Sequence, residues 1–115
     1  MRYFPLVLLL SALVCQGAEK PQVWGYGAKE CRDYNSTYSG WSVGDEAAIF
    51  EYLRYRSWLA GLATGLSLAT GIDVLKGVEI TGAMRSIQVY CDEHPDDPFF
   101  GASMDLIRSL SGLSG

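Results

Sequence analysis

The sequence is poor in basic residues and in histidine. Its 115 residues include 9 Lys+Arg against 13 Asp+Glu and a single His, which gives a formal net charge of −4. A nucleic-acid backbone is bound by a basic surface, so this balance argues against a nucleic-acid partner. With one histidine, three cysteines and no Cys-x-x-Cys pair, the chain also lacks the ligand spacing of a zinc site. We therefore predict no metal and no cofactor.

The chain is too short for a multi-domain enzyme and too apolar for a disordered segment. Hydrophobic residues make up 49% of it, aromatic residues 12% and charged residues only 19%. This length and composition are typical of one ordinary globular domain.

Groups suited to catalysis are equally scarce. His94, the only histidine, lies between an acidic pair and a proline at the end of a predicted helix. A general base needs a nucleophile or an orienting carboxylate within hydrogen-bond reach, and adjacency in sequence supplies neither. We expect His94 to interact with the carbonyls of that helix end. We predict that the protein has no catalytic residues and is not an enzyme; a small hydrolase is the unfavoured alternative.

Residues 1–17 follow the order of a secretory signal peptide. A short positive start precedes an almost unbroken apolar run from Pro5 to Val14, and small and polar residues come next. The run is shorter than the ~20 apolar residues that span a bilayer. We expect cleavage near Gly17 or Ala18 and a periplasmic or secreted mature chain.

Two alternatives exist for this segment. It could form a buried first helix, or Cys15 could be a lipidation site because it closes the apolar run. Lipidation is less favoured because Val14 occupies a position where a lipoprotein signal has a small residue. If residues 1–17 are a signal peptide, the mature domain is residues 18–115, and we expect no stable membrane insertion of it.

Two cysteines, Cys31 and Cys91, remain after cleavage. An even number of cysteines in a small exported chain indicates a disulfide. Closing a loop of about sixty residues would stabilise the fold by about 4 kcal/mol in the chain-entropy model. Two free buried thiols are the alternative.

The mature chain is predicted to be all-α, with four helices. Residues 19–27 should be an extended lead-in, and Ala28 to Tyr34 a short helix that carries Cys31. Residues 35–44 are rich in Ser, Gly and Tyr, which is typical of a loop. Asn35 in that segment begins an N-glycosylation sequon, which matters only in a eukaryotic host.

A long central helix is predicted between Asp45, as its cap, and Thr70, with Gly71 as the terminating residue. Apolar residues at spacings of three and four form its core stripe: Tyr52, Tyr55, Leu59, Leu62, Leu66 and Ala69. Small residues form a second line, which would allow the close approach of a neighbouring helix: Ser57, Gly61, Gly65 and Ala69.

The third helix is predicted from about Ile80 to Glu93, where His94-Pro95 ends it. One face of it, which includes Cys91, should point inward: Ile80, Met84, Ile87 and Cys91. The segment from Val74 to Ile80 could form a short strand, but it has no evident partner.

The last helix should be capped by Asp97, with Pro98 in its first position. Its predicted inner face is Phe100, Ser103, Met104, Ile107, Leu110 and Leu113. The acidic group before it is expected to form a solvated junction between helices: Asp92, Glu93, Asp96 and Asp97.

Three aromatic residues lie in or beside predicted loops: Trp24, Tyr34 and Trp41. Exposed aromatic side chains often anchor protein interfaces. We therefore take these three as candidate binding residues, with packing over the bundle as the commoner alternative.

The order of these features resembles HdeA-type periplasmic proteins and the similar Tai-type immunity proteins of type VI secretion. The matching parts are Cys31-Arg32-Asp33-Tyr34, Trp58-Leu59-Ala60-Gly61, the connector 72–80 and Tyr90-Cys91 with the helix after His94-Pro95. The resemblance covers about residues 28–110. It implies a disulfide-linked helical bundle in the bacterial periplasm that acts by binding other proteins.

The two groups imply different partners. HdeA-type proteins are acid-stress chaperones that open at low pH and shield unfolded clients, whereas Tai-type proteins block a toxic cell-wall amidase. This chain departs from the chaperone pattern because residues 105–115 contain no lysine. We expect an HdeA-like chaperone or stress protein, with an immunity protein as the alternative; a homodimer is left open.

Overall fold

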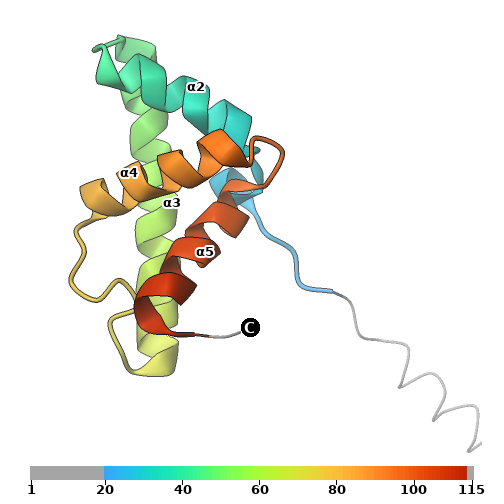
Figure 1. Ribbon diagram of the computed structural model, residues 1–115, viewed down its shortest axis with the longest axis vertical. Coiled ribbons are helices and arrows are strands. Elements are labelled where there is room, and N and C mark those ends of the chain that lie inside the picture. The colour runs from blue at the N-terminus through green and yellow to red at the C-terminus, as the bar shows by residue number, and fades with distance from the viewer. Residues whose placement is uncertain (1–19, 114–115) are drawn as a thin grey trace, which may run out of the picture.

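The computed structural model describes residues 20–113 and is all-helical within them (Figure 1). The elements are a short 3-10 helix and four α-helices: η1 (Gly25–Ala28), α2 (Cys31–Ser42), α3 (Glu46–Thr70), α4 (Ile80–Glu93) and α5 (Phe99–Ser111). α3 runs the length of the molecule, and α2, α4 and α5 pack against one side of it. The predicted four-helix fold with a long central helix and one disulfide is confirmed. The expected signal peptide, with Cys15, lies outside the described residues.

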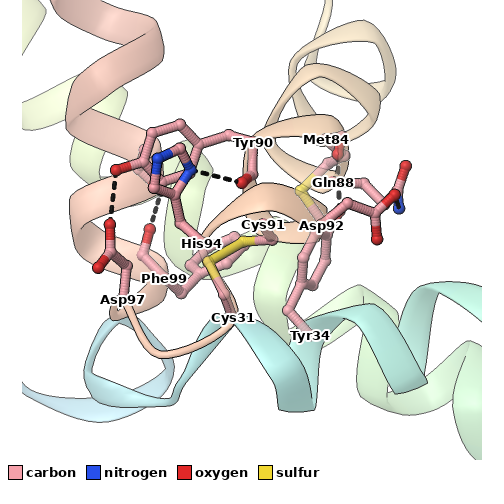
Figure 2. The surroundings of a disulfide bond; sticks show 11 residues. Cys31, Tyr34, Met84, Gln88, Tyr90, Cys91, Asp92, His94, Asp97 and Phe99 are labelled. Carbon is pink, nitrogen blue, oxygen red and sulfur yellow. Dashed lines mark hydrogen bonds between the residues drawn. A yellow bond between two sulfur atoms is a disulfide. The ribbon is translucent and has the colours of Figure 1, made fainter.

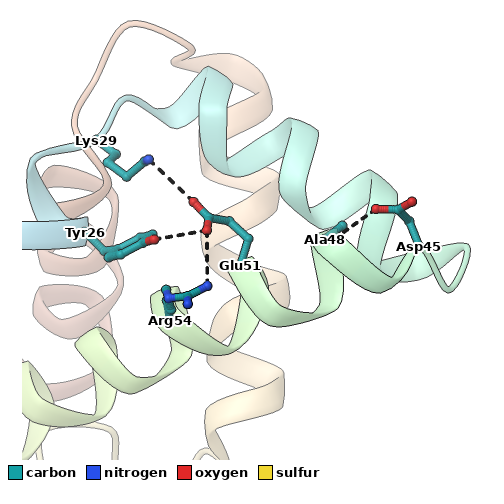
Figure 3. Close-up of polar contacts among 6 residues, drawn as sticks. All are labelled: Tyr26, Lys29, Asp45, Ala48, Glu51 and Arg54. Carbon is teal, nitrogen blue, oxygen red and sulfur yellow. Dashed lines mark hydrogen bonds and ion pairs between the residues drawn. The ribbon is translucent and has the colours of Figure 1, made fainter.

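Both ends of α3 are set by local sequence, as predicted. An Asp45 carboxylate oxygen accepts a hydrogen bond from the Ala48 backbone N–H at 2.9 Å, which caps the first turn (Figure 3). At the other end Gly71 adopts a left-handed conformation with φ 77°, and its N–H bonds to the Ser67 carbonyl.

The prediction for α2 is wrong beyond Tyr34. The helix continues to Ser42, and the expected loop shrinks to a turn at Val43 and Gly44. Tyr34 is completely buried and Tyr38 packs against the core, so tertiary contacts hold a segment whose composition favours a loop.

α4 has its predicted bounds, and His94 directly follows its last residue, Glu93. All four residues expected on its inner face contact the core, with Met84, Ile87 and Cys91 fully buried. The segment before it is no strand: residues 74–77 form a turn, and residues 78 and 79 have no regular structure.

The start of α5 differs from the prediction. Pro98, not Asp97, precedes the first helical residue, and no side chain caps this end. Asp97 instead accepts a hydrogen bond from the Tyr90 hydroxyl at 2.6 Å. Phe99 rather than Phe100 occupies the core.

The core has two parts. An aromatic cluster surrounds Tyr34 and includes Tyr55 and Phe99, whose ring centroids lie 4.8–5.0 Å from one another. A smaller aliphatic cluster lies at the C-terminal end of α3, where Ala63 contacts Val74, Leu75 and Ile107.

The disulfide between Cys31 and Cys91 joins the first residue of α2 to the last turn of α4 (Figure 2). Both residues are completely buried. Backbone hydrogen bonds reinforce the junction: the Cys31 N–H donates to Asp97 and the Phe99 N–H to Lys29, at 2.7 and 2.8 Å. The predicted pairing is confirmed, and it is compatible with an oxidising location outside the cytosol. Within residues 20–113 no helix has the length and apolarity to cross a membrane.

Candidate protein-binding surface

The face of α3 turned away from the other helices carries large apolar side chains in solvent. Leu68 is 81% exposed, Phe50 58% and Leu53 43%. Because successive residues of a helix are rotated by about 100°, these positions lie opposite the buried side chains of Tyr52 and Leu59. We call this surface, from Phe50 to Leu68, the α3 face.

Small residues separate the two ends of the α3 face: Ser57, Gly61 and Gly65, all exposed. The sequence predicted that a neighbouring helix would approach along this line, and that prediction is wrong. An added Cβ at Gly61 or Gly65 would meet no atom within 4 Å. Among the residues described, nothing packs on this part of α3.

Two open hollows flank the α3 face. The first, which we call the Phe50 groove, has a volume of about 610 Å³ and is lined by Gly25, Tyr26, Phe50, Leu53, Arg54, Ser57 and Trp58. The second, the Leu68 groove, has a volume of about 660 Å³ and is lined by Ala60, Ala63, Thr64, Ser67, Leu68, Gly71, Ile72, Asp73, Leu75 and Ile80. One hollow therefore lies at each end of the same helix.

The N-terminal segment forms one wall of the Phe50 groove. The Trp58 indole N–H donates to the Trp24 carbonyl at 2.9 Å. Gly27 lies so close to the Trp58 ring that an added Cβ would be 2.0 Å from it. This contact fixes the backbone of the segment while the Trp24 side chain stays 78% exposed.

Glu51 ties the same segment to α3 (Figure 3). Its carboxylate accepts a hydrogen bond from the Tyr26 hydroxyl at 3.0 Å and forms ion pairs with Lys29 at 3.5 Å and Arg54 at 3.7 Å. Burial raises the pKa of Tyr26, and the hydrogen bond to Glu51 raises it further. One carboxylate on α3 therefore links Tyr26 and Lys29 of the N-terminal segment and Arg54 of α3 itself.

The three predicted binding residues have different environments. Trp24 is exposed beside the Phe50 groove. Trp41 is half-buried, with its ring centroid 4.2 Å from that of Tyr52. Tyr34 is completely buried and is therefore not an exposed contact residue: its hydroxyl donates to the Met84 carbonyl at 2.8 Å, and burial raises its pKa. The structure does not bring these three side chains to one surface.

The large apolar residues of the α3 face were not singled out from the sequence. Phe50, Leu53 and Leu68 fall outside the predicted core stripe, at helical spacing on the opposite side of the same helix. Large apolar residues on both faces of one helix were the available signal.

The corner between α4 and α5 holds His94 and the acidic residues, of which Figure 2 shows Asp92 and Asp97. The His94 ring stacks on Tyr90 at 4.1 Å, and its Nδ1 lies 3.0 Å from the Tyr90 carbonyl, as expected of a residue at a helix end. Arg32 pairs with Asp96. The pKa of Tyr90 is raised to about 12, mainly by the hydrogen bond to Asp97 and to a smaller extent by burial. Over residues 20–113 no group of three or more His, Cys, Asp or Glu residues is arranged to hold a metal ion.

Comparisons of the chain with protein-family models, curated proteins and solved structures found no match. The likeness to HdeA-type and Tai-type proteins therefore rests on the sequence features alone. The α3 face is the feature of the structure from which function is inferred.

Proposed function

We propose that the protein is a non-enzymatic, exported protein-binding module, an HdeA-like chaperone or stress protein that holds unfolded clients on the α3 face. The observation that carries the proposal is the exposure of Phe50, Leu53 and Leu68 along one side of one helix. Burying such a side chain is worth about 1.5–3 kcal/mol. A folded chain that leaves several of them in solvent on one face is suited to binding apolar segments of other proteins.

Acid is the condition under which client binding is expected to increase. Ion pairs between carboxylates and basic side chains weaken in strong acid. In this chain such pairs join Glu51 to Lys29 and Arg54, and Asp96 to Arg32. The contacts that hold residues 24–29 over Trp58 then weaken. The Cys31–Cys91 bond does not depend on pH in this range and keeps α2 attached to α4.

An aggregation assay tests this function. The purified protein is mixed with a client that unfolds near pH 2, and light scattering is followed with time. The variants Phe50→Lys and Leu68→Lys place a charge on the α3 face that persists at pH 2, which a glutamate would not. Val89→Lys is the matched control, because Val89 is 56% exposed on α4, away from this face.

We expect the wild-type protein and Val89→Lys to suppress scattering equally, and Leu68→Lys to lose most of the suppression. No suppression by the wild-type protein would remove the chaperone role. Equal suppression by all variants would show that clients bind to a surface other than the α3 face.

A Tai-type immunity protein is the second candidate, and the Leu68 groove favours it. This hollow exists in the folded chain and combines apolar walls with the polar residues Thr64, Ser67 and Asp73. Such a surface suits one defined partner better than a range of clients. Calorimetric titration with a toxin encoded by a neighbouring gene should then show tight binding at neutral pH, weakened at least tenfold by Leu68→Lys; no binding would exclude this role for that toxin.

A further inference from the structure

The Phe50 groove combines apolar walls with one charged side chain. Phe50 and Leu53 of α3 supply apolar surface, together with the aromatic residues Tyr26 and Trp58. Among the described residues that line the groove, Arg54 is the only charged one, and its side chain is 61% exposed. A ligand complementary to this groove therefore has an apolar part and, close to it, a negative charge.

The Arg54 guanidinium has hydrogen-bond donors to spare. In the described part of the chain the only carboxylate within 4 Å is that of Glu51, whose Oε1 lies 3.7 Å from Nη1, too far for a hydrogen bond (Figure 3). Oε1 already accepts the Tyr26 hydroxyl, and Oε2 pairs with Lys29. Two cations thus share one carboxylate, so this cluster has one positive charge in excess in a chain whose net charge is −4. A second carboxylate would complete the pairing.

The helix places the apolar and the charged part of the groove one turn apart. Phe50 and Arg54 are four residues apart on α3, so their Cβ atoms lie about 5–6 Å from each other on one side of the helix. Leu53, three residues after Phe50, widens the apolar part. The last residue of a peptide has a matching arrangement, because its side chain and its carboxylate are attached to the same Cα.

The rim of the groove adds backbone groups that can pair with an extended chain. Residues 20–24 are exposed and have no regular secondary structure. Trp24 is extended, with φ −110° and ψ 151°, and its carbonyl is held by the Trp58 indole. Within the described part of the chain, the backbone of residues 20–23 forms no hydrogen bond. An extended peptide can pair with such a segment as it would with a free sheet edge.

We infer that the Phe50 groove binds the C-terminus of an extended peptide whose last residue is apolar. The inference rests on the proposed function, because it names the class of partner for one end of the α3 face. The terminal carboxylate pairs with Arg54, whose planar fork can donate two parallel hydrogen bonds to it. The last side chain packs on Phe50 and Leu53, and the preceding residues run along the rim.

Two other kinds of ligand share part of this chemistry. A fatty acid matches the charge and the apolar walls, but it has no backbone groups for the rim. An aspartate or glutamate inside a peptide supplies a carboxylate, but it carries no apolar side chain on the same Cα. The chain end is the ligand that meets all three features of the groove.

An NMR titration of the full chain at pH 7 measures the binding. The probe is an acetylated hexapeptide that ends in valine and leucine with a free carboxylate, and the comparison ligands are the same peptide with a terminal amide and hexanoate. We expect saturable shifts of the backbone amides of residues 50–58. The amide peptide should bind about tenfold more weakly, because it cannot form the charge-assisted hydrogen bonds to Arg54. Hexanoate should bind more weakly than the free peptide.

Two arginine variants test the position of the carboxylate. Arg54→Gln should weaken binding of the free peptide about tenfold and leave that of the amide peptide unchanged. Arg56→Gln is the matched control, because it removes the same charge from an exposed position of the same helix outside the groove lining. It should leave both affinities unchanged.

Three results would overturn the inference. The first is the absence of saturable shifts up to several millimolar free peptide. The second is equal binding of the free peptide and either comparison ligand. The third is equal weakening by Arg54→Gln and Arg56→Gln, which would reduce the effect to net charge.

These results are separable from those for the proposed function, which concern clients held near pH 2. A protein that protects a client in acid and binds no peptide at pH 7 would keep the chaperone role and exclude the C-terminal peptide. A protein that binds the peptide and protects no client would keep the peptide site and exclude the chaperone role.

Discussion

At the scale of single residues, close contacts rather than residue type decide what a glycine does. Gly27 and Gly61 are the same residue in opposite surroundings: Gly27 is buried against the Trp58 ring, and Gly61 faces open space in the middle of α3. The sequence predicted the reverse, with a neighbouring helix close to Gly61 and Gly27 in an extended lead-in. The packing of Trp58, which is a tertiary feature, makes the difference.

Two alanine substitutions test this difference. Gly27→Ala should lower the free energy of unfolding by about 1–3 kcal/mol, because its Cβ would overlap the Trp58 ring. Gly61→Ala should raise it by about 0.5–1 kcal/mol, because alanine is the better helix former and meets no atom there. Urea titrations followed by circular dichroism would measure both. Equal destabilisation by the two would contradict the packing described for Trp58.

The burial of Tyr34 could not be predicted from the residues next to it in the sequence. Its position beside a Ser- and Gly-rich segment made it a candidate for an exposed contact residue, with packing over the bundle as the commoner alternative. In the structure its ring lies at the centre of the aromatic cluster, and its hydroxyl bonds to the Met84 carbonyl fifty residues away. No local pattern indicates a partner at that distance.

At the scale of elements, the helices were predictable where local signals determine their ends. Asp45 and Gly71 bound α3, and His94-Pro95 ends α4, because a cap, a left-handed residue and a proline act on adjacent backbone groups. α2 was predicted too short because the composition of residues 35–44 favours a loop, and distant contacts override that preference. The α3 face was not predicted because a surface helix usually carries polar residues on the side opposite its buried stripe, and α3 carries large apolar residues there.

The disulfide links α2, whose length was predicted wrongly, to α4, whose bounds were predicted correctly. Replacing Cys31 and Cys91 by serine should lower the free energy of unfolding by about 4 kcal/mol, since the bond closes a loop of 60 residues. The predicted loss is greater than that from any of the exposed ion pairs, each worth about 0.2–1 kcal/mol. Guanidinium titration of the oxidised protein and the double variant would measure it; a loss below 1 kcal/mol would show that the bond contributes little to the fold.

At the scale of the whole molecule, tyrosines with raised pKa values make the free energy of unfolding depend on pH in the alkaline range. Burial or hydrogen bonds raise the pKa of five of them: Tyr26, Tyr34, Tyr52, Tyr55 and Tyr90. The folded state then holds phenolic protons that the unfolded state releases at about pH 10. Their contribution to stability is complete below that pH and is lost as the pH rises through the folded pKa values.

We therefore predict that the free energy of unfolding falls above pH 10. For Tyr90, whose folded pKa is about 12, the loss lies between about pH 10 and 12. Denaturant titrations at pH 8, 10 and 11, with tyrosinate absorbance as the second signal, would follow it. Tyr90→Phe should show a smaller loss than the wild-type protein over that interval; an identical pH profile would contradict the role given to the bond with Asp97.

Acid acts on a different set of groups in the same molecule. The ion pairs of Glu51 and Asp96 hold the N-terminal segment and the α4–α5 corner, whereas the disulfide and the two cores do not depend on carboxylates. Lowering the pH should therefore loosen residues 20–29 before the helices separate. Hydrogen exchange of the peptide 20–29 at pH 7 and pH 3, each corrected for the intrinsic exchange rate, would show this as a selective loss of protection.

We propose the α3 face as the surface that binds another protein. Site-specific photo-cross-linking tests it most directly, with a photoreactive amino acid placed at Leu68 or, as the control, at Val89, in the presence of an acid-unfolded client. We predict covalent adducts with the client from position 68 and only background from position 89. Aggregation suppressed by both proteins, with adducts from position 89 and none from position 68, would contradict the claim.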